Sequence, residues 1–369
     1  MEIKERVLET YQVLHQIPEL GHHEVQTSTY LANKLKSFGY EVTTGLGRGT
    51  GVIGVLKGGE AGPTVGLRAD MDALGFIIDD KPVNIHACGH DAHSSMVLAA
   101  AEALSKQGIK RGTLQIIFQP AEEVFGAIDM IKQGVGEDLD MLFGIHLRPI
   151  QEAKLGQMTP ALYHGASWTI KANIKGQVAH AARPHLGVNA INAACSIIQA
   201  VNSIATNPVV ASSVKATQIK GGGPASNSIP ESASITFDVR SSTNEVADDI
   251  LAKVKVAIES AAVAVGASAE MEIVGGVPAA SYNDEMIALA RESIVDVLGE
   301  EAVIEKIVTP GAEDFHYFTR EYPHLKAAYM GLGCDLTPGL HAPTMSFNTA
   351  ALENGSKVLV KTIEKALAR

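Results

Sequence analysis

The stretch His86-Ala-Cys-Gly-His-Asp-Ala-His93 restricts what this chain can fold into more than any other part of the sequence. It places three histidines, a cysteine and an aspartate between a polar turn (Asp79 to Pro82) and an alanine-rich run from Met96 to Leu104 that predicts a helix. Thiolate and imidazole suit a metal such as zinc, manganese or cobalt better than they suit a hydrophobic core. Gly89 would let the backbone turn sharply enough for both of its neighbours to point inward. Because a Cys-x-His pair also arises by chance, the rest of the chain must show whether this stretch binds a metal.

The composition narrows the class of protein. With 369 residues, of which 46% are hydrophobic, the chain can bury a sizeable core and is long enough for two domains. Acidic residues outnumber basic ones, the net charge is −11, and no basic cluster is longer than Lys110-Arg111, so we expect no nucleic-acid partner. The three cysteines form no CxxC pair, which suits a reducing compartment. Met1 to Leu14 lacks a signal-peptide core and no apolar run reaches membrane-spanning length, so we expect a cytoplasmic protein without membrane contacts.

Helix-like and strand-like segments alternate through the first 164 residues. The periodicity predicts helices over 2–16 and 24–38, followed by strands over 41–44, 51–57 and 64–67. The last of these strands runs into Arg68-Ala-Asp70-Met-Asp72. Two carboxylates just past a strand lie where open α/β sheets place their chemistry, although a helix cap or a solvated turn would explain the same pair.

Similar residues recur after the following strands. A strand over 113–119 ends in Pro120-Ala-Glu122-Glu123, and the next strand, over 141–145, ends in His146. Candidate ligands and acids therefore gather at one sheet edge. Adjacent glutamates project differently, so one can bind a metal while the other faces a water that the metal polarises, as in metal-assisted hydrolysis. His341, in a Gly/Pro-rich loop, is either an ordinary exposed histidine or the last ligand.

The pattern changes between residues 165 and 277. It reads as strand (167–174), helix (188–204), two strands (209–219 and 232–240), helix (244–263) and strand (269–274). This βαββαβ order predicts a ferredoxin-like α+β unit. Helix and strand alternation resumes afterwards, from a helix over 284–298 to a final helix over 350–367. We therefore predict an α/β domain over 1–164 and 278–369, with a second domain inserted over 165–277.

The combined motifs resemble the M20 family of metallo-hydrolases over nearly the whole chain. The closest branch is that of the amidohydrolases, with N-acyl-amino-acid, hippurate and indoleacetyl-amino-acid hydrolases. The matching motifs are RADMDAL (68–74), HACGHDAH (86–93), QPAEE (119–123), GIH (144–146), GQVAHAARPH (176–185), GAEDF (311–315) and LHAP (340–343). The resemblance implies a zinc-exopeptidase-like catalytic domain with an inserted lid.

The resemblance also implies roles for individual residues around two divalent metal ions. We expect these ions to be zinc or manganese, although cobalt or nickel would also suit the thiol, imidazole and carboxylate groups. The ligands that it implies are Cys88, His90, Glu123, His146 and His341, with Cys88 as a bridging thiolate. Glu122 matches the general base, and Asp72 matches an aspartate that holds a ligand in orientation. Asp70, His86 and His93 receive no role beyond support.

The inserted unit resembles the family's lid, which mediates homodimer formation. His180 matches a histidine that reaches the partner's site and stabilises the oxyanion. Asn227 and Arg240 match positions that grip the substrate, and a guanidinium suits a carboxylate. Without the resemblance, Asn227 and Arg240 would be read as structural residues.

The chain departs from the family pattern in three places. The loop between the DMDAL and HACGH motifs is short, and Gly75 to Asp79 replaces the usual proline-led, glutamate-rich segment. Val124-Phe125-Gly126 replaces a glycine run, and Asn189 stands where aspartate is common. These departures bear on the shape of the pocket mouth and hence on the acyl group accepted. We predict metal-dependent hydrolysis of the amide bond of N-acyl amino acids or related small conjugates, with Glu122 deprotonating the attacking water. One alternative is a dipeptidase or carboxypeptidase-like metallopeptidase. Another is a metal-bound binding protein without turnover.

Overall fold

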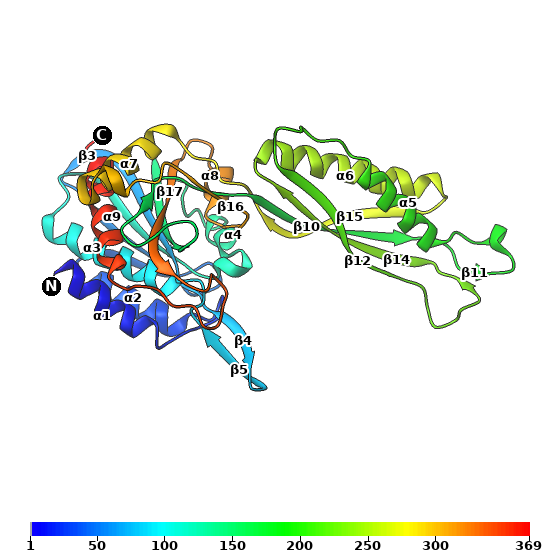
Figure 1. Ribbon diagram of the computed structural model, residues 1–369, viewed down its shortest axis with the longest axis horizontal. Coiled ribbons are helices and arrows are strands. Elements are labelled where there is room, and N and C mark those ends of the chain that lie inside the picture. Colours follow the sequence, from blue (N-terminus) through cyan, green and yellow to red (C-terminus); the bar gives the residue numbers. More distant parts are fainter. Residues whose placement is uncertain (1) are drawn as a thin grey trace. The chain divides into compact units, whose positions relative to one another are not determined.

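The computed structural model describes residues 2–369; Met1, where the predicted N-terminal segment begins, lies outside them. The chain forms two compact units (Figure 1). The main unit comprises the described residues through Tyr163, together with Ser281–Thr309 and Asp314–Arg369. The inserted unit comprises His164–Ala280 and Pro310–Glu313. Within the described residues, no helix is both long and apolar enough to cross a membrane.

A seven-stranded mixed sheet lies at the centre of the main unit, in the order β1-β2-β6-β3-β7-β17-β8. Its strands are β1 (Glu41–Leu46), β2 (Gly51–Lys57), β3 (Glu60–Asp70), β6 (Arg111–Gln119), β7 (Met141–Pro149), β8 (Met158–Thr159) and β17 (Lys326–Leu336). The four strands β6, β3, β7 and β17 run parallel to one another. Their sequences are largely apolar because both faces of this part of the sheet are buried. The α/β prediction for this part of the chain is confirmed.

The strand register brings the candidate residues to the same height. Asp70 pairs with Gln119 across β3 and β6, and Arg68 pairs with Gly144 across β3 and β7. His146, two residues beyond Gly144, therefore lies level with Asp70 at the carboxyl edge of the sheet. His146 lies inside β7 and does not follow it, because β7 continues to Pro149; the predicted strand end at Ile145 was wrong.

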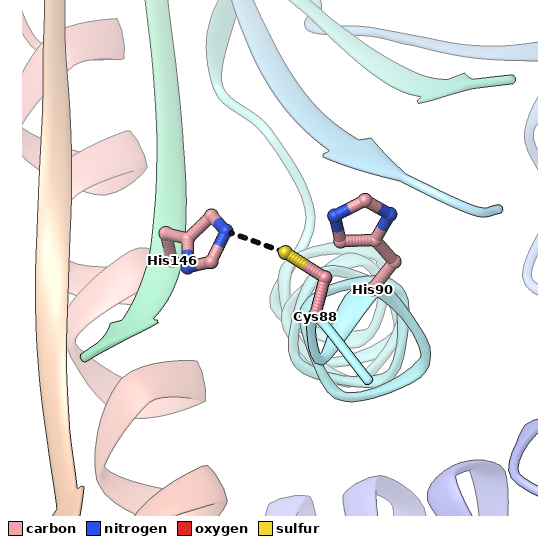
Figure 2. Close-up of side chains that lie close together, drawn as sticks. All are labelled: Cys88, His90 and His146. Carbon is pink, nitrogen blue, oxygen red and sulfur yellow. Dashed lines mark hydrogen bonds between the residues drawn. The ribbon is translucent and has the colours of Figure 1, made fainter. Parts of the chain in front are cut away.

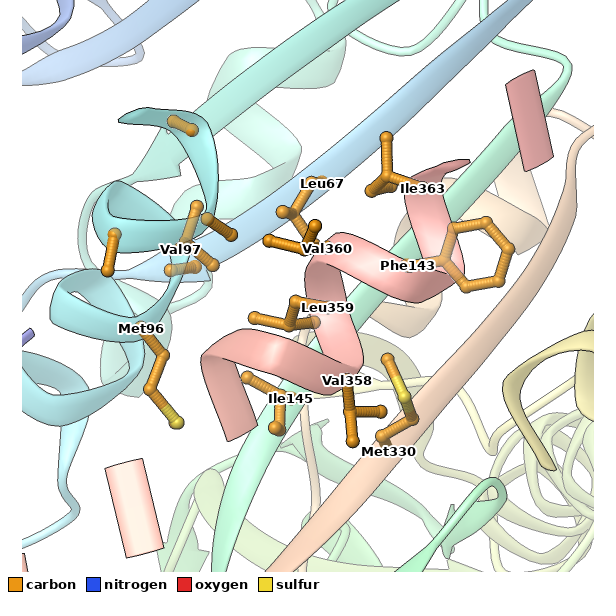
Figure 3. Packing of buried hydrophobic residues seen from close by; sticks show 14 of the residues in the cluster. Leu67, Met96, Val97, Phe143, Ile145, Met330, Val358, Leu359, Val360 and Ile363 are labelled. Carbon is orange, nitrogen blue, oxygen red and sulfur yellow. The ribbon is translucent and has the colours of Figure 1, made fainter. Parts of the chain in front are cut away.

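Helices cover the main sheet and build its core. They are α1 (Ile3–Leu14), α2 (Val25–Ser37), α3 (His90–Gln107), α7 (Asp284–Leu298) and α9 (Ala351–Leu367), with the shorter α4 (Gly126–Ile131) and α8 (His316–Glu321). α3 packs against α1, α9 and β3, and α9 also packs against β6 and β17. Figure 3 shows Leu67, Val97 and Leu359 in this core, each with 0% exposure. Burial of each such side chain contributes about 1.5–3 kcal/mol, so the core stabilises the strands that carry the candidate residues.

The helix α3 begins at His90, earlier than the apolar run from Met96 predicts. Gly89 precedes it with φ +90°, and a Cβ at Gly89 would lie 2.9 Å from Leu147 Cδ1. Only glycine fits both the conformation and the space without strain. The chain therefore turns sharply between Cys88 and His90, and the second half of the His86–His93 stretch forms the first turn of α3.

A β-hairpin that the sequence analysis did not foresee joins the first carboxylate motif to this stretch. It consists of β4 (Leu74–Ile78) and β5 (Lys81–Ile85). The polar turn between them was predicted, and Asp79 and Asp80 both have positive φ angles, as a two-residue hairpin turn requires. The hairpin is an exposed part of the region where the chain departs from the family pattern.

The inserted unit is an antiparallel sheet with two helices, in the predicted βαββαβ order. Its elements are β10 (Ala166–Lys175), α5 (Ala190–Asn202), β12 (Ser212–Gly221), β14 (Ser232–Ser241), α6 (Asn244–Ala264) and β15 (Ser268–Val277). The strand order β12-β14-β10-β15 is that of a ferredoxin-like sheet, and α5 packs beside α6 against it. Asn189 caps α5 by accepting the Ile191 amide at 2.9 Å.

Candidate metal centre

Cys88, His90 and His146 lie together at the carboxyl edge of the main sheet (Figure 2). Cys88 precedes α3, His90 begins it, and His146 comes from β7. One potential ligand atom from each lies within 4.8 Å of the others, and His146 Nε2 is 3.6 Å from Cys88 Sγ. All three side chains are buried.

Each of these histidines has one ring nitrogen held by an acceptor and the other turned toward the cluster. His146 Nδ1 donates to the Leu147 carbonyl at 2.7 Å, and His90 Nδ1 donates to Asp72 Oδ1 at 3.0 Å. In the neutral ring, the Nε2 atom of each histidine therefore carries the lone pair, as in metal-binding histidines. Among residues 2–369, no group hydrogen-bonds to the buried His90 Nε2. Glu122 Oε2 lies 3.9 Å from this nitrogen, beyond hydrogen-bond distance. A buried nitrogen without a hydrogen bond costs about 1–3 kcal/mol, and a cation would satisfy it, so the site fits a metal.

Glu122, Glu123 and His341 complete the group. Glu123 Oε1 lies 3.2 Å from His341 Nε2, and both lie within ligand distance of Cys88. Glu122 and Glu123 share a second group with His90. The fold thus brings together all five implied ligands and the glutamate beside them, from segments between residues 88 and 341. Mixed thiolate, imidazole and carboxylate donors suit zinc, manganese, cobalt or nickel.

Asp72 lies directly behind this group. Its Oδ1 accepts hydrogen bonds from His90 Nδ1 and, at 3.1 Å, from the Glu122 amide, and its Oδ2 accepts one from the Glu123 amide at 3.1 Å. One carboxylate therefore fixes the tautomer of His90 and the backbone of both glutamates.

His93 and Asp70 support β7 and do not belong to the ligand set. His93 Nε2 accepts the Leu147 amide at 2.9 Å, so Nδ1 must carry the ring proton, which it donates to Asp70 Oδ1 at 2.8 Å. Both nitrogens of His93 are thereby occupied, although Asp70, His90 and His93 lie within ligand distance of one another. Arg68 Nη1 binds the other oxygen of Asp70 at 2.7 Å.

The charges of the ionisable side chains at this site favour the binding of cations. Hydrogen bonds with Cys88 and Glu123 raise the pKa of His341 to about 10. Burial alone would lower the pKa of His90, but the charges of Asp70 and Cys88 hold it well above its ordinary value. Burial, together with His93 and Arg148, lowers the pKa of His146 well below the usual range. The raised pKa values favour the protonated forms of His90 and His341, and a histidine must lose a proton from the nitrogen that binds a metal, so metal binding should release protons.

The predicted lid residues lie on the inserted unit, and all three are exposed. His180, on β11 (Ala179–His180), pairs with Ser228, and the Ala181 amide donates to the Asn227 carbonyl at 2.9 Å. His180 and Asn227 are therefore neighbours. Arg240 lies near the end of β14, about 26 Å along the strand from Ser232, where the strand begins. Its guanidinium binds Asp238 Oδ1 at 3.0 Å.

Sequence reasoning missed two buried acids at this centre. The Asp314 amide donates to Glu122 Oε1 at 3.3 Å, and the Glu24 carboxylate accepts the Ala121 amide at 2.7 Å. Asp314 was part of the GAEDF motif, which marked it as polar but gave it no role. Glu24 stood in a predicted helix start with no signal of any other function.

Comparison with known proteins identifies the chain. Residues 66–365 match the peptidase family M20/M25/M40. The chain is 34% identical to the hippurate hydrolase of Campylobacter jejuni, over 96% of this chain and 94% of that protein. It is 32% identical to the IAA-amino acid hydrolase ILR1-like 2 of Arabidopsis thaliana, over 94% and 81%.

A solved structure agrees. The Bacillus subtilis YXEP protein, described as a dinuclear metal binding peptidase from the M20 family, superposes with a TM-score of 0.80 at 26% identity, over 99% of both chains. The match in sequence and in fold agrees with the family expected from the motifs. The chain belongs to peptidase family M20/M25/M40 and is a metal-dependent hydrolase of amide bonds.

Proposed function

We propose that this protein hydrolyses the amide bond of N-acyl amino acids or related conjugates. The observation that carries the proposal is the pair Glu122 and Glu123, held by Asp72 beside a cluster of thiol and imidazole donors. The names of the hippurate and IAA-amino acid hydrolases support this substrate class. We propose that five side chains hold two divalent ions, which we expect to be zinc or manganese. These side chains are Cys88, His90, Glu123, His146 and His341. Such ions supply Lewis acidity and lower the pKa of a bound water.

The proposed roles of the protein groups follow from their positions. Glu122 takes a proton from the attacking water and returns it to the nitrogen of the leaving amine. Its carboxylate is oriented for this task by the Asp314 amide. Asp72 keeps His90 in the tautomer whose Nε2 is available.

We assign the remaining roles to the inserted unit. His180 stabilises the oxyanion of the tetrahedral intermediate in the partner subunit of a homodimer, and Asn227 and Arg240 bind the substrate. The guanidinium of Arg240 is already oriented by Asp238, and it suits the free carboxylate of an amino acid. The three cysteines are free in the described part of the chain, which fits our proposal of a cytoplasmic location.

The test is hydrolysis of N-acetyl, N-benzoyl and indoleacetyl amino acids beside free dipeptides. The protein is stripped of metal, reloaded with zinc or manganese, and compared with the Glu122→Gln variant. We expect metal-dependent cleavage of acylated substrates and none by the variant. Cleavage of dipeptides alone would favour a peptidase, in keeping with the family name. Absence of turnover with every metal would favour a metal-bound binding protein.

A further inference from the structure

The turn that carries Glu122 and Glu123 is strained. Ala121 has φ 59° and ψ 41°, and Phe125 has φ 68° and ψ 40°, so two non-glycine residues adopt the left-handed conformation. For a residue with a side chain, this conformation is less favourable than a right-handed one, because Cβ lies too close to the following carbonyl oxygen. Such a turn persists only where the surrounding structure imposes it.

Three buried carboxylates from distant parts of the chain hold the backbone of this turn. Glu24 Oε1 accepts the Ala121 amide at 2.7 Å, and Asp314 Oδ2 accepts the Ala127 amide at 2.9 Å. Asp72 accepts the two amides between them, those of Glu122 and Glu123. Glu24 and Asp314 have 0% exposure, and Asp72 has 1%.

The two outer carboxylates are themselves fixed. Thr50 Oγ1 donates to Glu24 Oε2 at 2.7 Å. Arg68 Nη2 donates to Asp314 Oδ1 at 2.8 Å, and Gln119 Nε2 donates to the same atom at 2.7 Å. Burial raises the pKa of Glu24 in spite of its hydrogen bonds, so the fold retains an acid where an ionised group is unfavourable.

We propose that Glu24 and Asp314 are positioning residues which, together with Asp72, clamp the Ala121–Ala127 turn in its strained form. The clamp keeps Glu123 among the proposed metal-binding groups and Glu122 beside them. A single turn therefore positions both the proposed ligand and the proposed base. The role of Glu122 as base in this statement rests on the proposed function, but the hold on the backbone does not.

Substitutions at Glu24 can test the clamp because a glutamine at this position can make the same two hydrogen bonds, whereas an alanine cannot. In Glu24→Gln, the new side-chain carbonyl oxygen would accept the Ala121 amide, and the new NH₂ group would donate to Thr50 Oγ1. In Glu24→Ala, the buried Ala121 amide loses its hydrogen-bond partner, which is unfavourable. Because this hydrogen bond no longer offsets the strain at Ala121, the turn should leave its clamped form.

The experiment compares zinc-loaded wild type, Glu24→Ala, Glu24→Gln and Glu102→Ala. Glu102 is a buried acid that pairs with Arg6, and the variant therefore controls for general loss of stability. Hydrogen exchange is followed in the peptide that contains Ala121 to Glu123. Zinc affinity is measured by competition with a chelator. The constants kcat and KM are measured with N-benzoylglycine as substrate.

For Glu24→Ala we expect faster exchange in this peptide, zinc affinity weaker by about 10–100-fold, and a lower kcat with KM within about threefold. Glu24→Gln should lie near wild type, and Glu102→Ala should lose stability without these changes. Wild-type exchange and zinc affinity in Glu24→Ala would overturn the proposal, as would equal defects in Glu24→Gln. If wild type cleaves no substrate, the proposed function is wrong. Hydrogen exchange and zinc affinity then still show whether Glu24 holds the turn.

Discussion

Asp72→Asn should weaken metal binding even though Asp72 lies behind the ligands. The carboxylate accepts three hydrogen bonds, two at Oδ1 from His90 and the Glu122 amide and one at Oδ2 from the Glu123 amide. The asparagine oxygen can replace only one of these two atoms. Its best orientation keeps the Oδ1 contacts and turns an NH₂ group toward the Glu123 amide, so two donors face each other.

One lost hydrogen bond at a buried amide costs about 1–3 kcal/mol, and 1.4 kcal/mol corresponds to a factor of about 10 in affinity. Because the lost contact holds the backbone of the proposed ligand Glu123, we expect zinc to bind about 10–100-fold more weakly, the range typical of residues that orient ligands. Competition with a chelator measures this affinity. Glu102→Gln, which removes a buried charge elsewhere, is the control. Wild-type zinc affinity in Asp72→Asn would refute the role given to this carboxylate.

Three further variants test separate parts of the structure. Glu122→Gln should retain the full metal content and lose at least about 100-fold in kcat, because it removes a base; loss of metal would mean that the two glutamates have been assigned in reverse. Cys88→Ala should lower bound metal measured by elemental analysis, and a fully loaded, active variant would exclude a bridging thiolate. Arg6→Met should lower the free energy of unfolding in urea at pH 7 by about 1.5–3 kcal/mol, because Arg6 binds Glu102 with two hydrogen bonds. Burial would raise the pKa of Glu102, but its hydrogen bonds to Arg6 and Lys106 lower it overall, so the difference from wild type should shrink as the pH falls below about 4.5, through the lowered pKa. A difference that stays constant on acidification would contradict this sign.

Much of the fold follows from sequence periodicity. The inserted βαββαβ unit and the helix Asp284–Leu298 could be predicted because their apolar residues repeat with strand or helix spacing. The β4–β5 hairpin was missed because its exposed strands lack an apolar face toward a core, so Phe76 to Ile78 gave no burial pattern.

The ligand cluster was accessible from sequence for a topological reason. Asp72 and Glu123 follow β3 and β6, and His146 lies in β7. The three residues lie at the same edge because these strands are parallel neighbours, whose carboxyl ends coincide. Glu24 and Asp314 were not accessible in this way. Their partners lie 97 and 187 residues away along the chain, and no local spacing records contacts between single acids and backbone amides.

The central claim is that five side chains hold two metal ions at one end of the sheet. The most direct test is a crystal structure of zinc-loaded protein with anomalous diffraction at the zinc edge. We predict two peaks about 3.5–4 Å apart, both within about 2.3 Å of Cys88 Sγ, with His90, Glu123, His146 and His341 as the other protein ligands. A single peak, or peaks that exclude Cys88 or His341, would contradict the account.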